Sequence, residues 1–297
     1  MTFHAGCTAK RAATLALLVG IAAQSSCVLA RPARANVDLP SGIDGVSEVS
    51  FMSASGSTLR AWFARGRVGA GAVLLLHGVG ENRTAMLGRF RFLRARGYSV
   101  LAPDFQAHGE SPGAHITFGA RESLDAATAV EFLRSATPGE RLGVIGISMG
   151  GAAAVVAPSP LRVDAIVLES VYPTFRDAVA DRLKVWLGPF GIFGPAIAPL
   201  LIDLVGPRIG VSEDSLRPID RIANLNEPVL MLAGSEDRYT PLGEALTLFD
   251  RIRAPKRFWR VDGAGHEDLH AFAPGAYERV VGSFLDEQLS DHHADRR

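Results

Sequence analysis

The feature that most restricts the fold is the segment Gly-Ile-Ser-Met-Gly from Gly146 to Gly150, which directly follows an apolar run that begins at Leu142. A serine at a sharp turn from a strand into a helix has strained backbone dihedral angles, and the residues two positions before and after it crowd together. Glycine at both of those positions removes the Cβ atoms that would collide. The small residues from Gly151 to Val156 favour a helix that packs close to a sheet. We therefore predict a strand, a turn and a helix with Ser148 as a nucleophile at the turn; the alternative is a Gly/Ser turn without catalytic meaning.

A carboxylate and a histidine follow two later strand-like segments. Asp237 lies in the loop after the apolar run 229–233, and His266 lies in the loop after the segment 257–261. A serine hydroxyl is a poor nucleophile near neutral pH, so an imidazole must accept its proton, and a carboxylate must fix the tautomer of that imidazole. A turn aspartate and an exposed loop histidine are the alternatives. The order Ser, Asp, His favours a triad in which Asp237 orients His266 and His266 activates Ser148.

A fourth segment, His77-Gly78-Val79-Gly80, ends the apolar strand 73–76 and precedes a helix-compatible stretch, 84–96. The oxyanion formed when a serine attacks a carbonyl needs two N–H donors that are already aimed at it, and backbone amides in a tight turn provide them. We predict that these donors are the main-chain N–H groups of Val79 and Met149. For His77 we favour a structural role in bracing this loop over a catalytic one.

Three other carboxylates could compete for the role of the acid. Glu169 also ends a strand-like run, and Glu236 and Asp268 are neighbours of the triad candidates. We prefer Asp237 because of the loop in which it lies. The sequence contains no HExxH, no paired CxxC and no G-x-x-x-x-G-K-[ST] pattern, so we expect neither a metal nor another cofactor.

Together these segments resemble the α/β-hydrolase superfamily. The resemblance rests on HGxG at His77, D-x-x-x-H-G-x-S from Asp104 to Ser111, GISMGG at the predicted turn, GSEDRYTP around Asp237 and GAGH ending at His266. Among the branches of the superfamily, the chain is most similar to the serine-aminopeptidase-like and monoacylglycerol-lipase-like hydrolases, including the Bem46-like group. The likeness extends from Val46 to Leu289. It implies an α/β fold with a doubly wound, mostly parallel sheet and a small helical cap after the sixth strand, and it leaves the substrate open.

Composition and pattern agree with one catalytic domain. Continuous apolar runs such as 99–102 and 165–168 suit parallel strands that are buried on both faces. Helical patterns at 122–135 and 243–253 alternate with these runs, as in βαβ units. The chain carries 31 basic and 31 acidic residues and has no long basic run, so nucleic acid is not an expected partner.

The N-terminal segment has the pattern of an export signal. Lys10 and Arg11 form a basic region, 12–23 is an apolar core, and Val28-Leu29-Ala30 offers small residues for cleavage before Arg31. The apolar core is too short to span a bilayer comfortably, so we predict a cleaved signal peptide and an exported, periplasmic or extracellular, protein. Membrane tethering is the alternative, either through an uncleaved segment or through lipidation of Cys27. Gln24, three residues before that cysteine, argues against the lipidated form.

We divide the chain accordingly. The predicted regions are a signal peptide at 1–30, a flexible lead-in at 31–44, an α/β-hydrolase domain at 45–290 with a cap at about 171–224, and a polar tail at 291–297.

The predicted cap interrupts the regular alternation of strands and helices with an apolar stretch. Its large apolar residues could line an acyl pocket, contact a membrane or lipid surface, or simply pack the cap onto the sheet; they are Trp186, Phe190, Ile192, Phe193, Ile197, Leu200 and Leu201. We expect Pro189, Pro195 and Pro199 to break any long helix here, which argues against a membrane span.

The sequence thus predicts a serine hydrolase that cleaves carboxylic esters, thioesters or small amides of a small-molecule acyl substrate through an acyl-enzyme on Ser148. The alternative is a binding or scaffold protein that retains the fold without catalysis. Because a non-catalytic relative usually lacks one triad residue and this chain has a candidate for each, we favour the enzyme. The sequence leaves the acyl chain length, the leaving group and the oligomeric state open.

Overall fold

The centre of the molecule is an eight-stranded sheet, seen in a computed structural model that describes residues 30–290. Across the sheet the order is β10-β9-β8-β7-β4-β5-β3-β2, with parallel pairing from β10 to β5 and antiparallel pairing at β3 and β2. The strands are β2 (Val46–Met52), β3 (Thr58–Ala64), β4 (Ala72–Leu76), β5 (Ser99–Pro103), β7 (Leu142–Ile147), β8 (Ala165–Glu169), β9 (Val229–Gly234) and β10 (Lys256–Val261). This arrangement confirms the predicted doubly wound, mostly parallel sheet.

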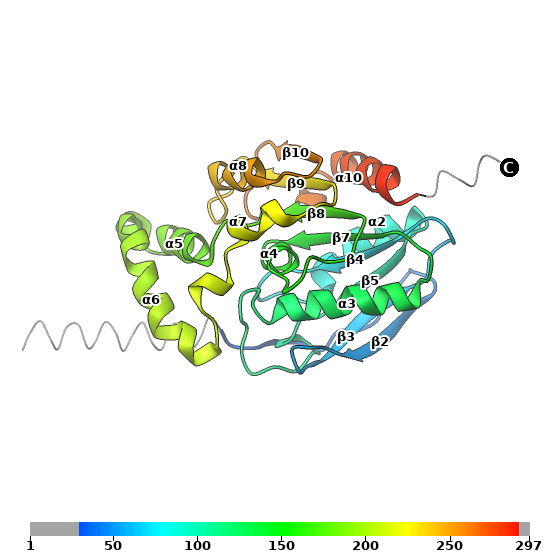
Figure 1. Ribbon diagram of the computed structural model, residues 1–297, viewed down its shortest axis with the longest axis horizontal. Coiled ribbons are helices and arrows are strands. Elements are labelled where there is room, and N and C mark those ends of the chain that lie inside the picture. The colour runs from blue at the N-terminus through cyan, green and yellow to red at the C-terminus, as the bar shows by residue number, and fades with distance from the viewer. Residues whose placement is uncertain (1–29, 291–297) are drawn as a thin grey trace, which may run out of the picture.

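Helices cover both faces of this sheet (Figure 1). Residues of α2 and α10 pack on one face, and residues of α3, α4 and α8 pack on the other. The helices outside the cap are η1 (Arg83–Met86), α2 (Leu87–Ala95), α3 (Glu122–Ala136), α4 (Met149–Val155), α8 (Leu242–Arg251), α9 (Leu269–Phe272) and α10 (Pro274–Leu289). Strands between two helical layers have no face in contact with water, which explains their continuous apolar sequences.

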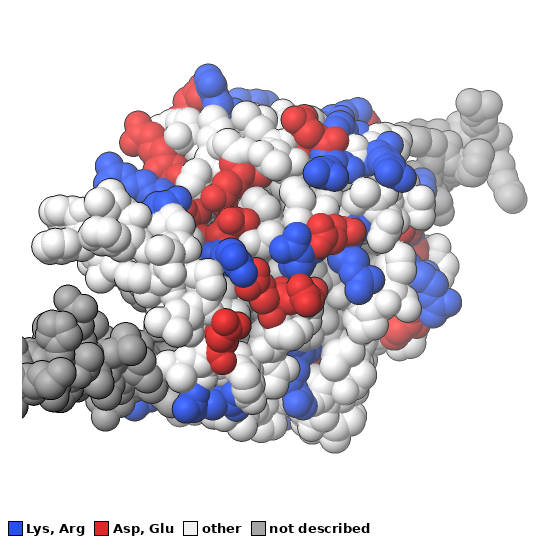
Figure 2. Space-filling view, turned by 60° about the vertical axis from the view of Figure 1, so that its left-hand side comes forward, with Lys and Arg blue, Asp and Glu red and all other residues white. Residues whose placement is uncertain are grey.

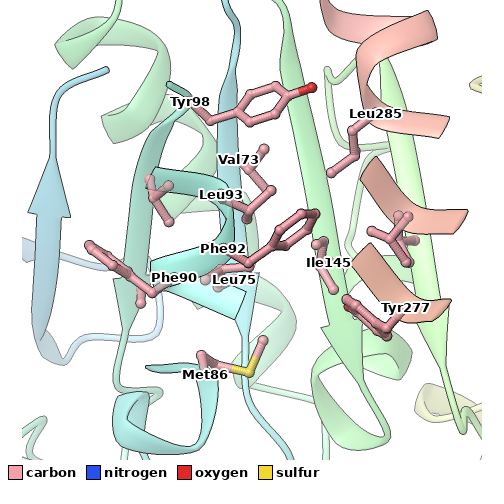
Figure 3. Close-up of a cluster of buried hydrophobic side chains, with 14 of the residues drawn as sticks. Val73, Leu75, Met86, Phe90, Phe92, Leu93, Tyr98, Ile145, Tyr277 and Leu285 are labelled. Atoms are coloured by element: carbon pink, nitrogen blue, oxygen red, sulfur yellow. The ribbon is translucent and has the colours of Figure 1, made fainter. Parts of the chain in front are cut away.

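The alternation of side chains along β4 shows how one strand serves both layers. Val73 and Leu75 belong to the cluster under α2 and α10, where Figure 3 shows them among Phe90, Leu93 and Tyr277. Leu74 and Leu76 belong to the cluster on the opposite face. Because successive side chains of a strand point to opposite faces, an apolar residue at every position is needed to fill both clusters.

The segment 171–224, which we call the cap, lies between β8 and β9. It contains α5 (Phe175–Trp186), η2 (Gly188–Phe193), α6 (Gly194–Ile209), η3 (Glu213–Ser215), α7 (Pro218–Arg221) and η4 (Ile222–Asn224). Figure 1 shows α5 and α6 at one side of the sheet. The Thr174 side chain caps α5 by accepting a hydrogen bond from the Asp177 N–H at 3.1 Å.

The expectation that prolines break every long helix of the cap is wrong in part. Pro189 and Pro195 do lie in the first turns of η2 and α6, where a missing N–H costs nothing. Pro199 and Pro207, however, lie inside α6. Packing of α6 against its neighbours therefore outweighs the local cost of proline.

The expected flexible lead-in at 31–44 is also corrected by the structure. Strand β1 (Ala33–Arg34) pairs in parallel with β6 (His108–Gly109), and Val37 is buried in the main core. The carbonyl of Ala30 accepts a hydrogen bond from the N–H of Ile116 at 2.9 Å. These contacts join positions far apart in sequence, so local composition did not reveal them. We call residues 30–37 the N-terminal strap. Of the proposed signal peptide at 1–30, residues 1–29, which include Cys27, lie outside the described residues, as does the tail at 291–297.

Candidate active site

Ser148 lies at the turn between β7 and α4 in a strained backbone conformation. Its φ is 48° and its ψ is −111°, a region that residues with a side chain rarely adopt. Its N–H donates to the carbonyl of Glu169 at 2.8 Å, which ties the turn to the end of the neighbouring strand. Strain of this kind persists only where the surroundings hold it in place, and it is concentrated at functional sites.

Two glycines allow this turn because backbone occupies the space on both sides of it. A Cβ atom at Gly146 would lie 2.6 Å from the Cα of Gly151, and one at Gly150 would lie 2.4 Å from the carbonyl oxygen of Leu76. Both separations are shorter than van der Waals contact, so a larger residue at either position would force the backbone to move. The close approach also places the start of α4 against the end of β4.

The predicted acid and base meet at the same edge of the sheet. His266 follows β10, Asp237 follows β9, and the Nδ1 of His266 lies 2.8 Å from Oδ2 of Asp237. A carboxylate can only accept here, so Nδ1 carries the proton. In the neutral ring, Nε2 is then the unprotonated nitrogen, as a general base requires.

Two residues that the sequence did not single out complete the binding of Asp237. Its Oδ1 accepts hydrogen bonds from the N–H groups of Tyr239 and Thr240, both at 2.8 Å, and its Oδ2 accepts one from the Thr240 hydroxyl at 2.6 Å. Burial would raise the pKa of Asp237, but the hydrogen bond and charge of His266, together with the Thr240 donors, hold that pKa below its ordinary value. An aspartate followed three residues later by a threonine is a local turn pattern that could have revealed Thr240.

The structure does not join Ser148 to this pair by a hydrogen bond. The Oγ of Ser148 is buried and has no hydrogen-bond partner within residues 30–290. Ser148 follows β7, and one strand, β8, separates β7 from β9. Catalytic hydrogen bonds are often long in the absence of substrate and tighten when it binds. The three predicted residues thus share one edge of the sheet, with the Asp–His contact formed and the Ser–His contact not formed.

The loop after β4 leaves one N–H group unused. The Gly78 N–H donates to Oε2 of Glu81 at 2.8 Å, and the Gly80 N–H donates to Nε2 of His108 at 3.2 Å. Among the described residues, the Val79 N–H between them has no acceptor. Met149 opens α4, and its N–H also has none in this part of the chain. The close approach of α4 to β4 brings these two elements together, as an oxyanion hole requires.

Two buried histidines brace this loop. Nδ1 of His77 donates to the Gly78 carbonyl at 2.8 Å, and Nε2 accepts from the Phe105 N–H at 3.1 Å. Burial, and then the charge of the neighbouring His108, lower the pKa of His77 to about 3, although the bond to the carbonyl acts in the opposite sense. Burial also lowers the pKa of His108. Both rings are therefore neutral supports of the loop, in agreement with the structural role favoured for His77.

Glu169 has a different partner from His266. Both of its carboxylate oxygens bind the buried guanidinium of Arg89, at 3.0 Å from Nε and 2.6 Å from Nη2, and the Tyr277 hydroxyl also donates to it. Arg89 was missed from sequence, although a charge on the core face of α2 is a signal for a buried ion pair. Asp268 caps α9 and lies 2.8 Å from Arg89. Neither carboxylate contacts His266 in the described part of the chain.

One cationic side chain of the cap contacts the loop that carries Asp237 and Tyr239. The guanidinium of Arg182, on α5, lies 5.7 Å above the Tyr239 ring, whose centre is 5.6 Å from the ring of His266. Burial lowers the pKa of Arg182. The position of α5 is therefore coupled to the residues around the base. Over residues 30–290, no group of three or more His, Cys, Asp or Glu side chains is arranged to hold a metal ion.

A strained serine turn and an Asp–His pair at one edge of a mostly parallel, doubly covered sheet define the α/β-hydrolase architecture. The chain belongs to the alpha/beta hydrolase family, whose family model matches residues 73–280. It is 30% identical to protein Rv2307c of Mycobacterium tuberculosis over 234 residues, which are 77% of this chain and 74% of that protein. It is 24% identical to alpha/beta hydrolase domain-containing protein 17C of Xenopus tropicalis over 250 residues, 83% of this chain and 72% of that one.

The fold is also similar to that of solved structures. The Pyrococcus furiosus esterase Pf2001 superposes with a TM-score of 0.73 at 24% sequence identity, with 88% of this chain and 99% of that chain covered. This likeness supports the architecture of the sheet and its helices.

Proposed function

We propose that this protein is a serine hydrolase that cleaves carboxylic ester or thioester bonds, with small amides as a further substrate class. Membership of the alpha/beta hydrolase family supports hydrolase activity in general. The observation that carries the finer proposal is the strained φ of 48° at Ser148 beside an Asp237–His266 pair at 2.8 Å. Glycine would adopt these dihedral angles at less cost, so a strained serine at this turn supports a role for its hydroxyl group.

The proposed reaction has two halves. Ser148 Oγ attacks the carbonyl carbon while its proton passes to Nε2 of His266, and the N–H groups of Val79 and Met149 donate to the resulting oxyanion. The tetrahedral intermediate collapses, the bond to the alcohol or thiol breaks, and that leaving group takes the proton from His266. Water then loses a proton to His266 and attacks the acyl carbon on Ser148. The second tetrahedral intermediate releases the acid as its bond to Ser148 Oγ breaks, and Oγ takes the proton back from His266.

Labelling with a fluorophosphonate probe and hydrolysis of a p-nitrophenyl ester series test the proposal. We expect the wild-type protein to be labelled and to hydrolyse at least one chain length. Ser148→Ala should abolish labelling, and Ser148→Ala and His266→Ala should each lower kcat by roughly 10⁴-fold or more. A folded protein that is neither labelled nor active on any ester would instead favour the non-catalytic binding or scaffold role.

We also propose that the protein is exported, by the N-terminal signal pattern of residues 1–30. N-terminal sequencing of protein recovered from its host tests this. A chain that starts at Arg31 supports secretion. A lipidated Cys27, or an intact Met1 in the membrane fraction, would show a tethered protein instead.

A further inference from the structure

The cap exposes an unusually large group of apolar side chains. Ile192 is 78% exposed and Phe190 70% exposed, although both are large and apolar. We call the following exposed residues the apolar tip: Trp186, Leu187, Phe190, Ile192, Phe193 and Leu200. Single exposed apolar residues are ordinary, but a contiguous group on one projection marks an interaction surface.

Charge is absent from the same stretch. No Asp, Glu, Lys or Arg occurs between Lys184 and Asp203. The lobe at the left of Figure 2, on the side of the cap, is correspondingly almost free of the blue and red groups that occur elsewhere in that view. A surface exposed only to water would not be stabilised by a run of this length without charged residues.

The packing of α6 determines how such a surface could meet a membrane. The segment Gly188–Ile209 has 22 residues, and its most apolar 18 residues have a mean hydropathy of 1.6, enough by length and composition to cross a bilayer, but only 22% of those 18 residues are buried. Along α6, Ala198, Ile202 and Ile209 form a buried stripe, and the last two pack in one cluster with Phe175 and Leu216. A helix fixed to the domain along one stripe can lie on a membrane surface but cannot cross the membrane without leaving its core.

The start of the described chain packs against the C-terminal half of α6, the helix that follows the apolar tip. Ala30 belongs to the buried cluster that contains Ile202 and Ile209 of α6. The apolar segment 12–23 precedes it by only a short stretch, 24–29. Even fully extended, these few residues would span at most about 20 Å. Whenever the apolar segment is held in a bilayer, α6 is therefore held near the surface of that bilayer.

We propose that the apolar tip inserts into the interfacial region of a lipid bilayer, with α6 lying along the surface. Aromatic and aliphatic side chains on a projecting, uncharged lobe suit a fluid surface that deforms around them. The neighbouring start of the chain points to the same partner, since its preceding segment is itself apolar. This interaction does not depend on the proposed hydrolysis, and the cap would carry it whether the N-terminal segment is retained or removed.

Flotation of the full chain with vesicles of phosphatidylcholine and phosphatidylglycerol tests the proposal. We expect the wild-type protein to float with the vesicles. The double variant Phe190→Ser/Ile192→Ser should bind on the order of 100-fold more weakly, because each large apolar side chain withdrawn from water contributes roughly tenfold. Leu246→Ser is the matched control: Leu246 is 42% exposed on α8, outside the cap, and its loss should leave binding unchanged. Equal flotation of the double variant and the wild type would overturn the proposal.

Fluorescence of Trp186 gives a second measurement that needs no change to the tip. Trp186 is 53% exposed, whereas Trp62 is 1% exposed and Trp259 is half-buried. The part of the quenching by acrylamide without vesicles, and by brominated lipids with them, that is lost in a variant without Trp186 therefore reports on the cap. Without vesicles, we expect acrylamide to quench the fluorescence of Trp186. With vesicles, we expect brominated lipid to quench it and acrylamide to quench it less. The variant Trp186→Phe assigns the signal. Protection from acrylamide in the absence of lipid would overturn the proposal: with a dimer detected by light scattering it would show that a second copy covers the tip, and with a monomer that the chain's own N-terminal segment does.

Discussion

Two carboxylates at neighbouring strand ends have different tasks because they have different partners. Asp237 accepts from His266, Tyr239 and Thr240, whereas Glu169 binds the buried Arg89. Removing one partner of a buried ion pair leaves an uncompensated charge, which is costly. Removing the charge of an acid that orients a base mainly affects the base. We therefore attribute the proposed difference between a catalytic role for Asp237 and a structural role for Glu169 to their individual contacts.

This contrast gives a pair of opposite expectations. Asp237→Asn should lower kcat by up to about 10⁴-fold and leave the thermal midpoint nearly unchanged, because the amide favours the wrong tautomer of His266. Glu169→Gln should cost about 3–5 kcal/mol of unfolding free energy and retain kcat per folded molecule. Ester hydrolysis and denaturant unfolding, measured on both variants, check this. A large loss of kcat in folded Glu169→Gln would assign the acid to β8 instead.

His77 predicts a loss of stability in weak acid. Its pKa in the folded protein, about 3, lies below the ordinary value of 6.5, so its contribution is present above pH 6.5 and is lost as the pH falls toward 3. Between pH 7.5 and 5 this amounts to about 2 kcal/mol. Urea unfolding at both pH values should show a smaller loss for His77→Asn than for the wild type. His115→Asn, at an exposed position, should behave as the wild type does. An unchanged pH dependence in His77→Asn would contradict the neutral, buried role.

At the scale of elements, one contact between the cap and the rest of the domain is made by two carboxylic acid side chains, one on α5 and one on α8. Oδ2 of Asp181 on α5 and Oε2 of Glu244 on α8 are buried and have no conventional partner among the described residues. Burial, and then the charge of Asp181, raise the pKa of Glu244 to about 8. Two carboxyl groups in contact are stable together when they share a proton. The contact between α5 and α8 is therefore sensitive to alkali.

The sign of this dependence follows from the raised pKa. The contribution of Glu244 is fully present below its ordinary value of 4.5 and is lost as the pH rises through about 8. Glu244→Gln removes the titration, so this variant should melt roughly 3 °C or more above the wild type at pH 9, and the difference should shrink at pH 5. Glu131→Gln, on the exposed face of α3, is the control. A constant difference across this pH range would refute the shared proton.

The sequence predicted those elements whose own pattern of apolar and polar residues depends on what covers them in the fold. Strands such as β4 and β7 are apolar at every position because both faces are covered, and Ser148 and Asp237 could be proposed because each follows such a strand. His266 follows β10, which is partly exposed and carries charged residues, so it was proposed from its loop and its order after Ser148 and Asp237. The strap and the interior prolines of α6 could not be predicted in this way. Their stability comes from partners distant in sequence, such as the bond between Arg83 and Val37. The same holds for the support that Arg89 gives to Glu169.

At the scale of the whole molecule, one buried arginine joins three regions. The side chain of Arg83 pairs with Asp104 after β5, with Glu110, and with the carbonyl of Val37 in the strap. Asp104 also accepts from the Glu110 N–H at 2.9 Å, next to the loop that carries His108. Because His108 in turn accepts from Gly80, this network ends at the proposed oxyanion hole.

We therefore expect Arg83→Leu to affect both stability and rate. Loss of the cation should cost about 3–5 kcal/mol of unfolding free energy, since it leaves Asp104 buried and unpaired. The surviving folded fraction should show a lower kcat with little change in KM, because the support of the oxyanion donors is weakened. Arg162→Leu is the control, as the Arg162 side chain is 74% exposed and pairs with Glu131 only at the surface. An unchanged kcat per folded molecule would show that this network does not support the proposed oxyanion hole.

The strap has a consequence for how far this enzyme could be shortened. A chain that began at Val46 would retain all eight strands of the main sheet and Ser148, Asp237 and His266. It would lose the carbonyl of Val37 that binds Arg83 and the pairing of β1 with His108. Such a shortened domain would keep the proposed catalytic residues but would lack the contacts that hold their surroundings. We therefore expect such a shortened chain to be less stable than the full one, because the strap contributes contacts that the sheet alone does not supply.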